Sequence, residues 1–155
     1  MISYRIARLP SEFATAKNLF LEYAHSLSVD LGFQEFDKEL ENIRVQYDQP
    51  GGALLIVYDG EVPVGCAGLR KLDPETAELK RMYVKPEFRN KKIGRALLER
   101  VLNLAGDLNY RKVRLDTLPE MRSARGLYRD FGFYEIPAYC FNPVPGTVYL
   151  EKMLL

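Results

Sequence analysis

The sequence predicts an α/β (α+β) fold, in which a mixed, mainly antiparallel sheet of about seven strands is flanked by about four helices. The first observation is the order of hydrophobic patterns along the 155 residues, which is β-α-α-β-β-β-α-β-α-β-β. The second is that three consecutive strands joined by short turns form an antiparallel meander. The third is a strand–helix–strand crossover after the meander, which requires parallel neighbours and places helices on both faces of the sheet.

The first third of the chain predicts one strand and two helices. Residues 2–9 alternate between apolar and polar side chains, as a half-buried strand does. A helix is predicted over residues 12–27, with Ser11 as its N-cap. Its buried face would consist of Phe13, Ala16, Phe20, Tyr23, Ala24 and Leu27. Apolar residues at helical spacing predict a second, short helix from Phe36 to Tyr47.

The middle of the chain predicts three strands and the crossover helix. Two β-rich runs within residues 53–72 flank Asp59 and Gly60, a strong signal for a two-residue hairpin. Residues 75–84 form the third strand. A helix over residues 92–108 follows, because its apolar residues recur on one face. These residues are Ile93, Leu97, Val101, Leu104 and Leu108.

The C-terminal part predicts one further helix between strands. Residues 112–118 form a strand, and Pro119 opens a helix that ends at Gly132. Its inner face would consist of Met121, Ala124, Leu127, Tyr128 and Phe131. Residues 133–136 and 147–154 close the chain as strands.

We expect a ligand site where the crossover interrupts the sheet. In open sheets with such crossovers, ligands favour the carboxyl ends of strands at a topological break. The strands over 76–84 and 112–118 should therefore separate near the site, with the 92–108 helix crossing between them.

Composition excludes several classes of function. A net charge of +1 argues against broad attraction to nucleic acid or to membranes. Two cysteines, Cys66 and Cys140, and one histidine, His25, offer neither a disulfide framework nor the ligand spacing of a metal site. No apolar run approaches the roughly 20 residues that span a bilayer, so we expect a cytoplasmic protein. The length suits a single domain over residues 1–155.

A cluster of cations marks the start of the crossover helix. Arg89, Lys91, Lys92 and Arg95 lie where the helix dipole already contributes positive charge. Free backbone N–H groups at such a terminus bind anions, and Gly94 leaves room for close approach. A pyrophosphate or several phosphates would suit this turn. The alternative is a solvated basic turn, and the P-loop pattern is absent.

Two motifs in this region resemble a known family. "ELKRMYVKPEFRNKKIGRALLERVL" (78–102), followed by "RSARGLYRDFGF" (122–133), is similar to the acetyl-coenzyme A signature of the GNAT N-acetyltransferases. The order of strands and helices fits the GNAT-like fold over the whole chain. The resemblance implies an enzyme that moves an acetyl group from acetyl-coenzyme A to a primary amine by direct attack in a ternary complex.

The first motif implies a set of cofactor-binding residues. Arg89 and Gly94 match the ends of the family's pattern, whereas Asn90 and Lys92 stand where it commonly has glycine. The resemblance implies that the turn cradles the pyrophosphate of coenzyme A and that the preceding strand binds its pantetheine arm. The turn comprises Arg89, Asn90, Lys91, Lys92, Ile93, Gly94 and Arg95, and the strand contributes Met82, Tyr83 and Val84.

The second motif implies a proton donor. Tyr128 matches the family's tyrosine, which lies near the sulfur and can protonate the departing thiolate. The alternative is a core tyrosine that packs beside Leu127 and Phe131. Met121 stands where the family usually has asparagine, so the resemblance does not carry over that polar contact to the pantetheine.

Glu78 is the predicted general base. An alkylamine is mostly protonated at neutral pH, so a proton must leave before attack. Strand alternation would place Glu78 on the same face as Met82, and similar enzymes often use a carboxylate on this strand. The alternative is a surface glutamate paired with Lys80 or Arg81. The backbone N–H near Met82 or Tyr83 would stabilise the oxyanion, as in the family.

The sequence leaves four classes of amine acceptor open: an amino acid, a polyamine, an aminoglycoside or a protein N-terminus. Residues 30–48 carry six acids that would suit a cationic amine, although a solvated acidic helix face explains them equally well: Asp30, Glu35, Asp37, Glu39, Glu41 and Asp48. Asp116, Thr117 and the 139–146 loop could also select the acceptor.

A homodimer through terminal strands is plausible. The competing class of function is a non-catalytic acyl-coenzyme A-binding sensor.

Overall fold

In the computed structural model, residues 1–27, 30–89 and 92–154 are described, and within them seven strands form one sheet in the order β1-β2-β3-β4-β5-β7-β6. The strands are β1 (Ile2–Ile6), β2 (Ala53–Asp59), β3 (Val62–Asp73), β4 (Thr76–Val84), β5 (Lys112–Thr117), β6 (Tyr134–Ile136) and β7 (Val148–Met153). β4 and β5 pair in parallel, and the other neighbours pair antiparallel. The predicted mixed, mainly antiparallel sheet is confirmed.

The described residues form five α-helices rather than about four. They are α1 (Pro10–Ser26), α2 (Phe36–Glu41), α3 (Ile43–Tyr47), α4 (Ile93–Asp107) and α5 (Arg122–Asp130), with short 3-10 helices at Leu31–Gln34 and Pro86–Phe88. The extra helix arises because Asn42 interrupts the predicted helix from Phe36 to Tyr47. Its amide Nδ2 donates to the carbonyl of Lys38 at 2.9 Å, a local bond of the kind that ends helices.

The start of α1 differs from the prediction. Ser11 is not the N-cap, because the helix begins at Pro10, whose fixed φ and missing N–H suit the first helical position. The carboxylate of Glu12 accepts from the backbone N–H groups of Arg8 and Leu9, both at 2.9 Å. These bonds lower the pKa of Glu12 and satisfy donors at the helix entrance.

The two ends of α5 are set by local turns. Pro119 does not open the helix, because residues 118–121 form a turn in which the N–H of Met121 donates to the carbonyl of Leu118 at 3.0 Å. The predicted end is confirmed, since Gly132 has a φ of 90° that suits glycine. The N–H of Phe133 then donates to the carbonyl of Tyr128 at 3.1 Å, as in a Schellman motif.

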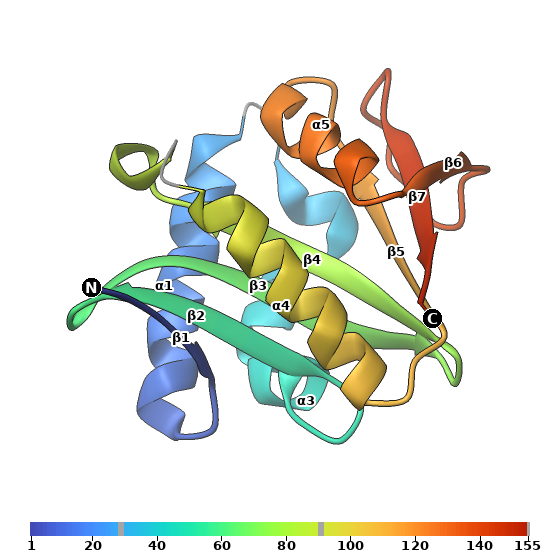
Figure 1. The fold of residues 1–155 in the computed structure, drawn as a ribbon. Helices are drawn as coiled ribbons and strands as arrows, with labels where there is room; N and C mark the ends of the chain where they lie inside the picture. Colours follow the sequence, from blue (N-terminus) through green and yellow to red (C-terminus); the bar gives the residue numbers. More distant parts are fainter. Residues whose placement is uncertain (28–29, 90–91, 155) are drawn as a thin grey trace.

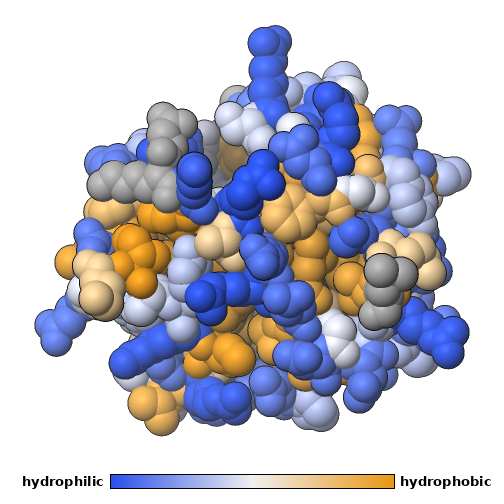
Figure 2. All heavy atoms as spheres, viewed as in Figure 1, coloured by the Kyte–Doolittle hydropathy of each residue, from blue (hydrophilic) through white to orange (hydrophobic). Residues whose placement is uncertain are grey.

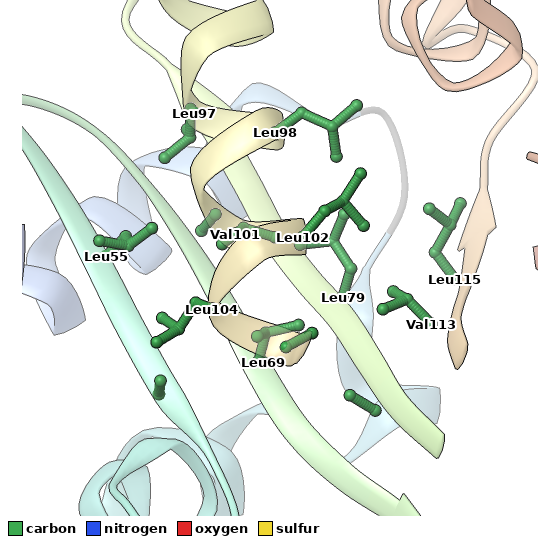
Figure 3. Packing of buried hydrophobic residues seen from close by; sticks show 14 of the residues in the cluster. Leu55, Leu69, Leu79, Leu97, Leu98, Val101, Leu102, Leu104, Val113 and Leu115 are labelled. Atoms are coloured by element: carbon green, nitrogen blue, oxygen red, sulfur yellow. The ribbon is translucent and has the colours of Figure 1, made fainter. Parts of the chain in front are cut away.

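Helices cover both faces of the sheet, as predicted. α4 and α5 lie on one face and α1 to α3 on the other (Figure 1). Leucines of α4 point toward the strands beneath, among them Leu98 and Leu102, which extend toward Leu79 and Leu115 (Figure 3). The second core, under α1 to α3, includes Phe13, Phe20, Tyr47, Leu54 and Ile56. The sheet is therefore held between two apolar layers.

The sheet opens between its two parallel strands. Over the described residues, β4 and β5 pair through Thr76–Glu78 and Lys112–Arg114 and not beyond. Past that point β4 stays with β3, and β5 stays with β7, so the two strands diverge toward α5 (Figure 1). This confirms the predicted separation, and it leaves one backbone edge of residues 79–84 unpaired by β5.

A bulge in β4 changes which side chains share a face. Arg81 has a φ of 59°, and the register with β3 slips by one residue there. Ala77 and Leu79 face the α4 core, so Glu78 faces α1 to α3. After the bulge, Met82 faces α4. The expectation that Glu78 and Met82 lie on one face is therefore wrong.

The surface on the α4 side is largely hydrophilic, and its apolar atoms appear in separate patches (Figure 2). Within the described residues, no helix combines the length and apolar content that crossing a bilayer requires. The exposed large hydrophobic residues lie scattered over several elements and include Leu9, Val45, Val62 and Phe141.

Candidate active site

An open cleft of about 710 Å³ lies between the end of β4, the start of α4 and α5. Its volume falls within the range of small-molecule sites in proteins. Seven of the predicted cofactor-binding residues line it: Met82, Tyr83, Val84, Arg89, Lys92, Ile93 and Gly94. Asn90 and Lys91 lie outside the described residues. The structure therefore brings most of the predicted set to one cleft.

The start of α4 gives this cleft a cationic end. Lys92 is the N-cap of α4, and the N–H groups of the first helical turn have no intrahelical partner. Arg89 lies beside it, with its Nε donating to the carbonyl of Val84 at 2.9 Å. Arg122, from the start of α5, adds a third cationic side chain to the lining. A helix N-terminus with adjacent cations suits phosphate groups.

Gly94 leaves space in the cleft that the protein itself does not use. A Cβ built at this position would meet the Cδ2 of Leu127 at 3.8 Å, which is ordinary contact. Packing within the described residues therefore does not demand glycine here. The absence of a side chain instead keeps the helix backbone accessible from the cleft.

Arg95 lies differently from the other cations. Its guanidinium pairs with the carboxylate of Asp130 at 3.1 Å and lies over the ring of Phe131 at 5.5 Å. Both contacts direct it toward the end of α5, and it is absent from the described lining of the cleft. The expectation that Arg95 faces the same anion as Arg89 has no support in this geometry.

The strand wall of the cleft has an open backbone edge. Met82, Tyr83 and Val84 line the cleft on the side where β4 has left β5. An extended ligand could therefore hydrogen-bond along this edge, as a strand would. The hydroxyl of Tyr83 donates to Glu22 at 2.8 Å. Burial and this bond raise the pKa of Tyr83 to about 12.

A small inner cavity of about 50 Å³ lies beside the cleft, between the diverging strands. Both spaces are lined by Tyr23, Leu27, Met82, Met121 and Ala124. Polar side chains then line the inner part: Lys80, Arg81, Asp116, Tyr128 and Asn142. A ligand that enters along the β4 edge would thus end among these groups.

Tyr128 lies in α5 at this inner cavity. It is 6% exposed, and its ring packs against Phe133 with centroids 5.5 Å apart. Its hydroxyl makes no hydrogen bond within the described part of the chain. Burial raises the pKa of Tyr128, and the charge of Asp116 adds to this effect. The phenol therefore stays protonated at neutral pH, which a proton donor requires.

Glu78 is held in a buried network. It is 1% exposed, and its Oε1 accepts from the Nε of Arg70 at 2.8 Å, while its Oε2 accepts from the hydroxyl of Tyr139 at 2.7 Å. Its ion-pair partner is thus Arg70, directly opposite on β3, rather than Lys80 or Arg81. Glu78 is absent from the described linings of both cleft and cavity.

Asp116 is the acid among the described lining residues of the inner cavity. Its Oδ2 accepts from the Nδ2 of Asn142 at 2.9 Å. Its Oδ1 accepts no hydrogen bond from the described residues. The sequence already indicated Asp116 as a residue that could select the acceptor, and the structure brings it to the same cavity as Tyr128.

The acidic segment 30–48 does not form a uniform acidic surface. Glu39 is buried and accepts from Arg81 at 2.9 and 2.7 Å and from Tyr47 at 2.9 Å. Burial alone would raise the pKa of Glu39, but the hydrogen bonds and charge of Arg81 outweigh it, so the pKa is lowered. Glu35 pairs with Lys38 at 3.1 Å. The segment therefore gives little support to attraction of a cationic amine.

Sequence reasoning missed several residues of the site. The sequence gives Tyr23 and Arg122 no role at the site, because a lone tyrosine or arginine carries no spacing signal. It indicates Asn142 only as part of the 139–146 loop. Arg70 could have been found from cross-strand pairing in the predicted meander, where a basic residue directly opposite Glu78 is stabilising.

Comparison with known protein families identifies the family of this chain. The profile of the "Acetyltransferase (GNAT) family" matches residues 17–133, which is most of the chain. The chain belongs to the GNAT family. A relative named as an uncharacterized N-acetyltransferase of Schizosaccharomyces pombe is 35% identical over 152 residues and covers 97% of this chain and 93% of its own length.

Other comparisons agree with GNAT membership. N-acetylaspartate synthetase of Mus musculus is 35% identical over 142 residues, which cover 88% of this chain but 47% of that protein. A GNAT-family acetyltransferase of Staphylococcus aureus has a TM-score of 0.79 at 26% identity, covering 99% of this chain and 100% of that chain. An acetyltransferase of Streptococcus agalactiae shares the fold, with a TM-score of 0.80 at 21% identity over 99% and 98% of the two chains.

These findings make the protein a GNAT-type N-acetyltransferase. GNAT enzymes use acyl-coenzyme A as donor and act on amine acceptors. The seven-stranded sheet and the split between its parallel strands over the described residues agree with this membership. The cleft and the inner cavity are thus the candidate donor and acceptor sites.

Proposed function

We propose that this enzyme transfers an acetyl group from acetyl-coenzyme A to the primary amine of a small molecule, by direct attack in a ternary complex. One observation carries the proposal: a cleft with a cationic end lies beside a small cavity lined by Tyr128 and Asp116, and the two spaces share lining residues. Two substrates could meet there without a covalent enzyme intermediate. No cysteine is among the described residues that line the cavity.

The cofactor would lie along the strand edge of the cleft. Arg89, Lys92 and the first N–H groups of α4, near Gly94, would bind its pyrophosphate. Residues 82–84 would hydrogen-bond the pantetheine arm through their open backbone edge. Asn90, Lys91 and Ile93 belong to the same proposed turn, and Arg95 would contribute only if its ion pair with Asp130 opened.

Two carboxylates compete for the role of base. Asp116 lines the cavity and has one oxygen without a donor in the described chain, so we propose that it takes the proton of the amine. Glu78, the base that the sequence indicates, would act through the hydroxyl of Tyr139 or a water, since both its oxygens already accept hydrogen bonds. Asp116→Asn and Glu78→Gln separate the two.

Tyr128 would protonate the leaving sulfur. The amine nitrogen forms its bond to the acetyl carbon as the carbon–sulfur bond breaks, and the thiolate takes the phenol proton. The ammonium group loses two protons: one leaves through the base to solvent, and the other restores the phenol of Tyr128. The products are therefore an amide, the thiol of coenzyme A and one released proton. Backbone N–H groups near Met82 and Tyr83 would stabilise the oxyanion.

The test is thiol release from acetyl-coenzyme A in the presence of a panel of amines. The panel includes aspartate, because a relative carries the name N-acetylaspartate synthetase. Thiol and acetylated amine should appear in equal amounts, and Asp116→Asn should slow the reaction more than Glu78→Gln. Tight binding of acetyl-coenzyme A without turnover of any amine would favour the second candidate, a non-catalytic acyl-coenzyme A sensor.

Three finer points belong to the same proposal. The donor would be acetyl-coenzyme A rather than another acyl-coenzyme A. The protein would act in the cytoplasm as a single domain over residues 1–155, without nucleic acid or membrane partners. A homodimer through the terminal strands would be compatible with a site built from one chain.

A further inference from the structure

The loop between β6 and β7, residues 137–147, is bonded to both parallel strands of the split. The hydroxyl of Tyr139 donates to the Oε2 of Glu78 on β4 at 2.7 Å. Three residues later, the Nδ2 of Asn142 donates to the Oδ2 of Asp116 on β5 at 2.9 Å. The loop thus contacts each of the two carboxylates that compete for the role of base.

A further contact holds this loop against β7. The hydroxyl of Tyr149 donates to the carbonyl of Cys140 at 3.0 Å, and the rings of Tyr139 and Tyr149 meet edge to face with centroids 5.6 Å apart. Tyr149 lies directly opposite Asp116 in the pairing of β5 with β7. Because directly opposite side chains project from the same face of an antiparallel pair, the loop lies over the face that carries Asp116.

Both ends of the Asn142 amide have a partner. Its Oδ1 accepts from the N–H of Val144 at 3.1 Å, as in an Asx turn, while its Nδ2 donates to Asp116. Rotation of the amide by half a turn would set an oxygen against the carboxylate and an NH2 group against the N–H, and both contacts would be repulsive. The turn within the loop therefore fixes which end of the amide faces Asp116.

The orientation of the Asp116 carboxylate depends on this amide. Among the described residues this carboxylate forms no ion pair, and Asn142 is the hydrogen-bond donor to its Oδ2. The terminal torsion of an aspartate is broad, so a bond to one oxygen restricts it and gives the other oxygen a defined direction. A group that takes up a proton in catalysis needs such a direction, because small displacements of reacting groups lower the rate strongly.

The size of the inner cavity limits what can reach Asp116. Its volume of about 50 Å³ has room for a few water-sized groups, which suits the reacting end of an acceptor rather than the whole molecule. The rest of the acceptor would then bind outside the cavity. A change at Asn142 should therefore affect the catalytic step more than acceptor binding.

We infer that Asn142 is a positioning residue, which holds the Oδ2 of Asp116 so that its Oδ1 takes the proton of the attacking amine. This inference rests on the proposed function, because it adds a residue to the proton path of that reaction. The proton moves from the amine nitrogen to Oδ1 and then to solvent, which restores the carboxylate. Asn142 exchanges no proton itself and acts through Asp116.

A double-mutant cycle between Asn142 and Asp116 tests the inference. Thiol release by the full chain is measured at saturating acetyl-coenzyme A, with aspartate or, where aspartate is not used, with the most rapidly acetylated amine of the panel. Asn142→Ala should lower kcat about 10-fold and change the KM for the amine by less than about 2-fold. In the Asp116→Asn background it should have almost no further effect, because the carboxylate that it positions is gone. An equal fall in kcat in both backgrounds would overturn the inference.

A second pair of substitutions separates the turn from the bond to Asp116. Asn142→Ser supplies a hydroxyl that can accept from the N–H of Val144, but it is one bond too short to replace the amide donor. It should reproduce the fall in kcat while the melting temperature stays near the wild-type value. Asn142→Gln keeps an amide donor and should restore part of the rate that Asn142→Ala loses. A wild-type kcat in Asn142→Ser would contradict the positioning role.

Tyr149→Phe is the matched control within the same loop. It removes the bond to the carbonyl of Cys140 and keeps the ring against Tyr139, and it leaves the bond between Asn142 and Asp116 in place. Its kcat should stay within about 2-fold of wild type. A fall as large as that in Asn142→Ala would mean that any loosening of the loop slows the reaction, which contradicts a specific role for Asn142.

The inference and the proposed function fail in different ways. Turnover that Asp116→Asn slows and Asn142→Ala does not would leave Asp116 as the base and remove the role of Asn142. Turnover that Asp116→Asn leaves unchanged would remove both roles, while the N-acetyltransferase activity would stand. Absence of turnover with every amine would overturn the proposed function and the inference together.

Discussion

Tyr128 combines burial with a hydroxyl that has no hydrogen-bond partner in the described chain. Most buried polar groups are paired, so an unpaired phenol at a cavity wall suggests a ligand partner. Its ring is held by Phe133 and the helix, and these contacts do not depend on the hydroxyl. The packing role and the catalytic role of Tyr128 can therefore be separated by a substitution that removes only the hydroxyl.

Tyr128→Phe should lower kcat about 100-fold, the lower end for a general acid, because a thiolate is already a fair leaving group. The affinity for acetyl-coenzyme A, measured by calorimetry, and the melting temperature should stay nearly unchanged. Turnover at the wild-type rate would show that Tyr128 is a packing residue. A loss of more than about 2 kcal/mol in stability would instead reveal a structural hydrogen bond.

Lys92 gives a second prediction at this scale, because it stands in the left-handed region with a φ of 61°. Lys92→Ala removes the charge and keeps the Cβ, whereas Lys92→Gly removes both. Both variants should weaken acetyl-coenzyme A binding by up to about 5-fold. The Gly variant should be about 1 kcal/mol more stable than the Ala variant by thermal unfolding. Equal stabilities of the Gly and Ala variants would contradict backbone strain at position 92.

At the scale of elements, the sequence predicted the order of strands and helices and the split, but not the local irregularities. Periodicity identifies elements because it reflects burial on one face. It could not find the bulge at Arg81, since neither Gly nor Asn marks the left-handed residue. The face of Glu78 was therefore misassigned relative to Met82. The break at Asn42 was missed because apolar spacing continues across it.

The start of α4 allows a matched pair of substitutions on one helix. Gly94→Val should leave stability near wild type, since a Cβ there meets only the Cδ2 of Leu127 at 3.8 Å. It should reduce acetyl-coenzyme A affinity at least about 10-fold by filling the cleft. Gly106→Val, at the other end of α4, has nothing within 4 Å and should not change affinity. Calorimetry with unchanged affinity for Gly94→Val would place the cofactor elsewhere.

The pair Glu39–Arg81 joins α2 to β4 and predicts acid sensitivity. The folded protein lowers the pKa of Glu39 below its ordinary 4.5, so the unfolded chain takes up the proton first as pH falls. This contribution to stability is present above about pH 4.5 and is lost as pH falls through the folded pKa.

Glu39→Gln should weaken the fall in the free energy of unfolding that urea unfolding measures as pH drops below about 4.5. It should also cost about 3 kcal/mol near neutral pH, because Arg81 keeps a buried charge without its counterion. Glu35→Gln, in an exposed pair with Lys38, is the matched control and should change little. An unchanged acid slope in Glu39→Gln would mean that other carboxylates set the acid limit.

At the scale of the whole molecule, the two apolar layers hold the sheet while its two parallel strands diverge. The divergence places the cleft and the inner cavity side by side, and Tyr23, Met82 and Met121 line both. Donor and acceptor would therefore be bound together before chemistry begins. Because the net charge is only +1, attraction of charged substrates depends on local charged groups rather than on the charge of the whole protein.

The steady-state rate pattern tests this central claim most directly. Initial rates are measured while acetyl-coenzyme A is varied at several fixed concentrations of a turned-over amine. Direct attack in a ternary complex predicts double-reciprocal lines that intersect. Parallel lines, together with an acetylated enzyme detected by mass spectrometry in the absence of amine, would indicate a covalent intermediate and contradict the account.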